Sequence, residues 1–102
     1  MKIELTNDGA RLVECDDFAH FLVSSPAAYD DTQIAAVLHD SGAGYLSADG
    51  AMISATWVQA QMEPTTVWLE GFHAMLSFAE SHGWLANGGK AIRAHIERSI
   101  KN

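Results

Sequence analysis

The segment from Pro64 to His82 constrains the fold of this chain most, because its apolar side chains repeat with the period of an α-helix. The repeat at i, i+4, i+7, i+8 and i+11 forms one apolar stripe, made of Trp68, Phe72, Met75, Leu76 and Ala79. Pro64 suits the first turn of a helix, and Gly83 suits the position just past a helix end. The pattern predicts an amphipathic helix over Pro64–His82, with Trp84 packing back on its last turn.

A second helix is expected to begin near Asp30. The run Asp30-Asp31-Thr32-Gln33 is a variant of the capping box, in which side chains bond the first backbone N–H groups. The buried stripe would be formed by Ile34, Val37 and Leu38. Gly42 is expected to end this helix, since glycine readily adopts the left-handed conformation found there.

A shorter helix is expected in the segment before Pro26. Asp16 or Asp17 is a suitable N-cap residue. One apolar face would follow at the i, i+3, i+4 spacing, formed by Phe18, Phe21 and Leu22. Pro26 would end the helix, because the residue before a proline avoids helical backbone angles.

Two β-hairpins are expected, each with an Asp-Gly pair at its turn. The first joins Lys2–Thr6, where apolar and polar residues alternate, to Arg11–Cys15. The second joins Gly44–Ser47 to Ala51–Ala60 through Asp49-Gly50. A two-residue turn there places Ala48 opposite Ala51 and Leu46 opposite Ile53. The expected core face of this hairpin consists of Leu46, Ile53, Ala55 and Trp57.

The segment 91–100 is compatible with two structures. Ile92, Ile96 and Ile100 fit one face of a helix, whereas residues 92–97 nearly alternate as a strand does. The segment is short, rich in isoleucine and preceded by Asn87-Gly88-Gly89, which favours a strand that closes the sheet. A helix is the alternative.

These elements predict an α+β fold, with an antiparallel sheet of four to five strands packed against one long and two short helices. The chain has 102 residues, the size of a single domain that covers 1–102. Apolar residues make up 48% of it, which is enough for one ordinary core.

The charge of the chain excludes some partners. The formal net charge is −7, and all of it lies in residues 1–50, because residues 51–102 carry equal numbers of acidic and basic side chains. An acidic surface repels phosphate groups, so neither nucleic acid nor a membrane is expected as a partner. The basic C-terminal residues could face the acidic half, within one chain or across a homodimer. A single cysteine, Cys15, and the absence of a signal-like start indicate the cytoplasm.

Metal binding has one weak pair of candidates. Glu70 and His73 have the Glu-x-x-His spacing that occurs twice in di-iron helical bundles, together with further glutamates. Here the motif occurs once, and a solvated helix face is the preferred explanation. No metal and no cofactor are therefore expected.

Arg93, His95 and Glu97 are the candidate catalytic residues. On a strand their i, i+2, i+4 spacing places them on one face, where they could line a cleft. A histidine exchanges protons near neutral pH, and a neighbouring carboxylate can orient its ring. The alternative is an exposed sheet face with cross-strand charge pairs.

Two functions follow from these observations. The first is a non-catalytic interaction or ligand-binding domain, a possible homodimer that recognises a protein or a small molecule. Three tryptophans, the uneven charge and the lack of a catalytic motif favour it. The second is a small enzyme that uses His95, with Arg93 and Glu97, for acid–base chemistry on a small molecule.

Overall fold

The computed structural model describes residues 1–48 and 50–98. It contains three helices within these ranges: α1 (Asp31–Ser41), α2 (Ala55–Ala60) and α3 (Thr66–Ser81). The strands there are β1 (Lys2–Thr6), β2 (Gly9–Val13), β3 (Leu22–Ser25), β4 (Gly44–Ser47), β5 (Gly50–Ser54), β6 (Leu85–Ala86) and β7 (Ala91–Arg98). The strand predicted for the last segment is thus confirmed, while Asp49 and Ile100 lie outside the described residues.

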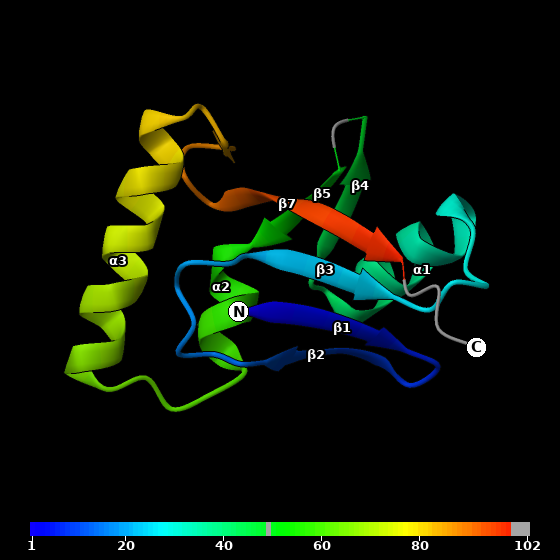
Figure 1. Cartoon of the computed structure of the whole chain (residues 1–102), viewed down its shortest axis with the longest axis horizontal. Coiled ribbons are helices and arrows are strands. Elements are labelled where there is room, and N and C mark those ends of the chain that lie inside the picture. Colours follow the sequence, from blue (N-terminus) through cyan, green and yellow to red (C-terminus); the bar gives the residue numbers. More distant parts are fainter. Residues whose placement is uncertain (49, 99–102) are drawn as a thin grey trace.

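The strands form one curled sheet in the order β2-β1-β3-β7-β5-β4, and β6 pairs with β7 outside this order (Figure 1). β3 runs parallel to both β1 and β7, whereas the other pairs are antiparallel. The α+β class is confirmed, but the predicted antiparallel sheet of four to five strands is wrong. The sheet is mixed because β3 enters between the first and last long strands, a placement that local patterns do not encode.

The short helix predicted around Phe18 and Leu22 is also wrong. Residues 14–21 form turns, and Leu22 begins β3. Leu22 pairs with Lys2 on one side and with His95 on the other, so both edges of the segment are hydrogen-bonded. These pairs with distant strands outweigh the weak local tendency of a short apolar repeat to form a helix.

The second hairpin differs from its prediction in length and register. Ser47 pairs with Gly50 and Leu46 with Ala51, a shift of two residues that leaves Leu46 and Ile53 on the same face. The second strand ends at Ser54. The Ser54 hydroxyl oxygen accepts a hydrogen bond from the Trp57 N–H group and so caps α2. Ala55–Ala60 is therefore helix rather than strand, because this cap satisfies an otherwise unpaired N–H group.

The predicted start and end of α1 and the predicted end of α3 are confirmed, whereas the predicted start of α3 is wrong. Asp30 and Gln33 form the complete capping box of α1, and Gly42 ends α1 with a φ of 78°. Thr65 caps α3, so Pro64 stands before the cap and not in the first turn. None of the helices in residues 1–48 and 50–98 is long and apolar enough to cross a membrane.

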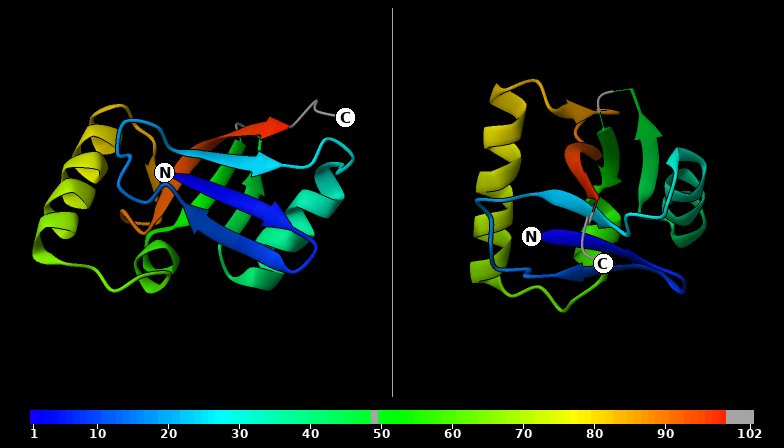
Figure 2. Two further views of the ribbon diagram at one scale, coloured as in Figure 1. Left: turned by 60° about the horizontal axis from the view of Figure 1, so that its bottom comes forward. Right: turned by 45° about the vertical axis from the view of Figure 1, so that its right-hand side comes forward.

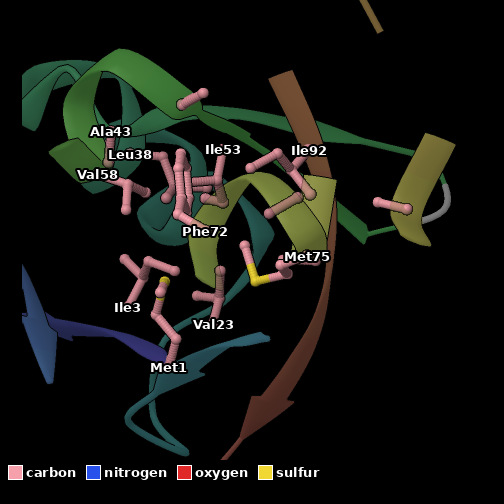
Figure 3. Packing of buried hydrophobic residues seen from close by; sticks show 14 of the residues in the cluster. Met1, Ile3, Val23, Leu38, Ala43, Ile53, Val58, Phe72, Met75 and Ile92 are labelled. Carbon is pink, nitrogen blue, oxygen red and sulfur yellow. The ribbon is translucent and has the colours of Figure 1, made fainter. Parts of the chain in front are cut away.

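The core lies between one face of the sheet and the helices. Backbone register places Ile3, Val23, Ile53 and Ile92 on that face. Phe72 of α3 is fully buried near the centre of the cluster (Figure 3). α3 and α1 stand at opposite ends of the molecule, and α3 covers the end where β3 and β7 begin (Figures 1 and 2).

Candidate functional site

Arg93, His95 and Glu97 lie on one face of β7, as their spacing predicts. Ile92, on the opposite face, is buried in the core. Arg93 is half-buried, whereas His95 and Glu97 are exposed. β7 therefore divides its side chains between the apolar core and a polar face that is accessible to solvent.

Three strands pair with β7, although a strand has only two edges. Ile92 pairs with Ile53 of β5 and with Leu85 of β6, so β5 and β6 lie on opposite edges. β7 lies between β3 and β5 in the sheet, so β3 and β6 pair with the same edge of β7. β6 pairs with the start of β7 and β3 with its last four residues. At the junction between them, the Arg93 N–H group donates to the Trp84 carbonyl oxygen at 2.8 Å.

Trp84 forms one side of this junction. The Trp84 N–H group donates to the Ala79 carbonyl oxygen at 2.9 Å, and the Gly83 N–H group donates to that of Glu80 at 3.0 Å. This is the Schellman motif predicted for the end of α3. The Trp84 ring packs edge-on against Phe78, with 5.9 Å between ring centroids. Trp84 is consequently held by both α3 and β7.

Residues 17–22 form the other side. The Met1 amino group donates to the carbonyl oxygens of Asp17 at 2.5 Å and His20 at 2.7 Å, which anchors this segment to β1. The His20 ring nitrogen, 3.1 Å from the Asp17 carboxylate, holds the pKa of that carboxyl below its usual value. Burial lowers the pKa of the Met1 amino group.

Phe18 attaches the same segment to α3. The Phe18 ring packs against Trp68 with 5.8 Å between centroids, and the Trp68 indole N–H donates to the Cys15 carbonyl oxygen at 2.8 Å. A Cβ atom on Gly71 would lie 2.5 Å from the Phe18 ring. The glycine in the middle of α3, which costs helix stability, thus makes room for Phe18.

A hollow of about 640 Å³ opens between these two sides and β7. This volume is within the range of small-molecule sites. Its apolar lining consists of Phe18, Ala19, Phe21, Leu22, Met75, Phe78, Ala79, Trp84 and Ile92. Its polar lining consists of His20, Arg93, His95 and Glu97. The structure therefore brings all three predicted catalytic residues to one hollow with a mainly apolar wall.

The predicted metal candidates are elsewhere. Glu70 and His73 are exposed on α3 and do not line the hollow. In residues 1–48 and 50–98 no group of three or more potential metal ligands comes together. Cys15 is a half-buried free thiol.

Sequence reasoning missed the apolar half of the hollow and His20. Phe18 and Phe21 were expected on a helix, and Trp84 was expected to pack only on the last turn of α3. Two signals pointed to this region, namely the glycine inside the strongest helix and the number of tryptophans. Neither signal shows which distant segments meet.

Comparison with protein-family models, with curated proteins and with solved structures finds no match for this chain. A function can therefore be argued only from the geometry and chemistry of the residues themselves.

Proposed function

We propose that this protein is a non-catalytic domain that binds a small apolar molecule in the hollow between α3, residues 17–22 and β7. The observation that carries this proposal is the lining, which is an apolar wall from three elements with a few polar groups along one strand. Such a lining is typical of small-molecule sites. The size and concave shape of the hollow favour a small ligand over a protein surface.

The exposed part of the apolar wall supports the same proposal. Phe78 is 57% exposed although it is a large apolar residue, and it stands at the rim of the hollow. The Phe78 ring forms an aromatic cluster with the rings of His82 and Trp84, and the ring centroids of Phe78 and His82 are 4.3 Å apart. A ligand in the hollow would cover apolar surface that water now contacts, which stabilises the complex.

N-phenyl-1-naphthylamine, a neutral dye that fluoresces in apolar sites, tests the proposal. We expect one dye molecule to bind per chain, and Phe78→Gln to weaken binding about threefold to tenfold through lost apolar contact. Fluorescence titration measures both. Val67→Gln is the matched control, since Val67 lies on the same helix, is 78% exposed and does not line the hollow.

The circular dichroism of both variants in the near ultraviolet should match that of the original protein, because each changes an exposed position. Absence of dye binding, or equal affinities for the two variants, would refute a binding site in the hollow. The proposed cytoplasmic location is supported by the lone thiol of Cys15. The homodimer stays a prediction, which native mass spectrometry tests through the subunit number.

An acid–base enzyme is the second candidate, because Arg93, His95 and Glu97 line the same hollow. In such an enzyme His95 would move the proton, Glu97 would orient or stabilise the imidazole, and Arg93 would bind an anionic substrate group. Binding without catalysis is preferred, since no hydrogen bond fixes the His95 ring among the described residues. A catalytic histidine is usually oriented by a third group.

The enzyme alternative makes a direct prediction for any activity found with a small molecule. His95→Ala should reduce turnover by about a hundredfold or more, the usual contribution of a general acid or base. His73→Ala, on the outer face of α3, should leave turnover unchanged. Equal turnover of the two variants in a steady-state assay would remove His95 from the mechanism.

A further inference from the structure

The polar lining of the hollow is not uniform. A smaller hollow of about 350 Å³ is lined by Phe21, Trp84, Arg93 and His95, and all four also line the larger one. Glu97 lines the larger hollow but not the smaller one. Among the described residues, the smaller hollow next to Phe21 and Trp84 therefore offers a guanidinium and an imidazole, without the Glu97 carboxylate.

The two polar groups that line the smaller hollow, those of Arg93 and His95, can both donate hydrogen bonds. A guanidinium has five N–H donors and no acceptor, and an imidazole ring has at least one N–H donor. Arg93 also takes part in an interaction within the chain, but its five donors allow it to serve a second acceptor. The fork of a guanidinium matches the two oxygens of a carboxylate.

The residues around the smaller hollow indicate which chemical groups the rest of the ligand carries. Phe21 and Trp84 border it with aromatic rings, and the larger hollow continues along Met75, Phe78 and Ala79. Glu97 follows His95 by two residues, about 6.7 Å along a strand. Its carboxylate would repel a second negative charge on the ligand.

We propose that the ligand is a small molecule with a flat apolar body and a single carboxylate, and that Arg93 and His95 bind the carboxylate between Phe21 and Trp84. This inference rests on the proposed function, since it assigns the chemical class of the ligand in the same hollow. A molecule with one anionic end matches the donor-rich smaller hollow, and its apolar body matches the wall formed by α3.

Displacement of N-phenyl-1-naphthylamine by 2-naphthoate and by 2-naphthamide tests the inference. The two compounds have the same ring system and differ in the charge of one group. At pH 7.5 we expect 2-naphthoate to displace the dye at an about tenfold lower concentration, the usual gain from a charged hydrogen bond. Added salt should reduce this preference, because ions screen an accessible charge.

Variants of Arg93 test whether this residue causes the preference for 2-naphthoate. Arg93→Gln should abolish the preference for 2-naphthoate over 2-naphthamide, and Arg93→Lys should retain part of that preference. Lys90→Gln is the matched control, since it removes one positive charge from an exposed side chain that does not line the hollow. The circular dichroism of Arg93→Gln in the near ultraviolet should match that of the original protein, which shows that this variant folds.

Each outcome decides between the two proposals. Equal displacement by 2-naphthoate and 2-naphthamide, with the dye bound, would overturn the carboxylate and leave the binding site intact. Stronger displacement by the cation 2-naphthylmethylammonium would also overturn it and would assign the polar contact to Glu97. Failure of the dye to bind the original protein would overturn the proposed function and this inference with it.

Discussion

Replacement of Phe72 by alanine is expected to lower the free energy of unfolding by about 3–5 kcal/mol, the usual cost of removing a buried aromatic side chain. Phe72 is fully buried and stacks on Trp68 with 4.9 Å between ring centroids. Its ring packs near the centre of the core, where Ile53, Leu38 and Val58 are also fully buried (Figure 3). The loss of its contacts therefore weakens the packing of α3 on the core.

Chemical denaturation measures this change, and the melting temperature should fall by about 15–30 °C. Val67→Ala on the same helix is the control, because Val67 is 78% exposed and its loss leaves no cavity. The control should change the stability by no more than about 0.5 kcal/mol. A loss below about 1 kcal/mol for Phe72→Ala would contradict the central position of this ring.

Gly44→Ala is expected to be the second most damaging change, with a loss of about 3 kcal/mol or more, at the upper end of overpacking effects. A Cβ atom on Gly44 would overlap the Met52 carbonyl oxygen and lie 2.9 Å from the Met52 carbonyl carbon. Gly44 pairs with Ile53, next to the bond from the Ser54 N–H group to the Ala43 carbonyl oxygen. These neighbours are backbone atoms of a central strand and cannot rotate away.

Gly42→Ala, two residues earlier, is the control that distinguishes this steric overlap from the general effect of replacing a glycine. Gly42 has a φ of 78°, and beyond its neighbours along the chain no described atom lies within 4 Å of the place that its Cβ would occupy. Alanine should therefore cost only the strain of left-handed backbone, about 1–2 kcal/mol. Thermal unfolding ranks the two variants. A larger loss for Gly42→Ala would show that β4 and β5 do not approach as closely as described.

The elements that sequence patterns predicted correctly depend on contacts within a few residues. The capping box of α1 joins Asp30 to Gln33, and the Schellman motif after α3 joins Ala79 to Trp84. The apolar stripe of α3 repeats over whole turns, and four of its five residues are buried. Interactions of this range leave a signal in the local order of residues.

The incorrect predictions concern segments whose structure depends on distant partners. Leu22 became part of a strand because it lies between β1 and β7. Ala55–Ala60 continued the apolar run of β5, yet Ser54 ends the strand by capping α2. In both segments the local pattern was compatible with two structures, and contacts or caps decided between them.

The candidate site divides in the same way. Three of its four polar residues could be predicted, because the alternation of β7 places Arg93, His95 and Glu97 on one face whatever lies next to it. Its apolar half could not, because Phe21 and Trp84 are far apart in the sequence and meet only where β3 and β6 share one edge of β7.

The sequence by itself thus determined the α3 stripe, both ends of α1, the end of α3 and the polar face of β7, since periodicity and capping act over a few residues. Only the tertiary structure decided that β3 lies between β1 and β7, and that residues 17–22 reach α3 over Gly71. The physical reason is that pairing and packing energies of distant segments outweigh the small local preferences of short segments. The hollow is a product of that long-range pairing.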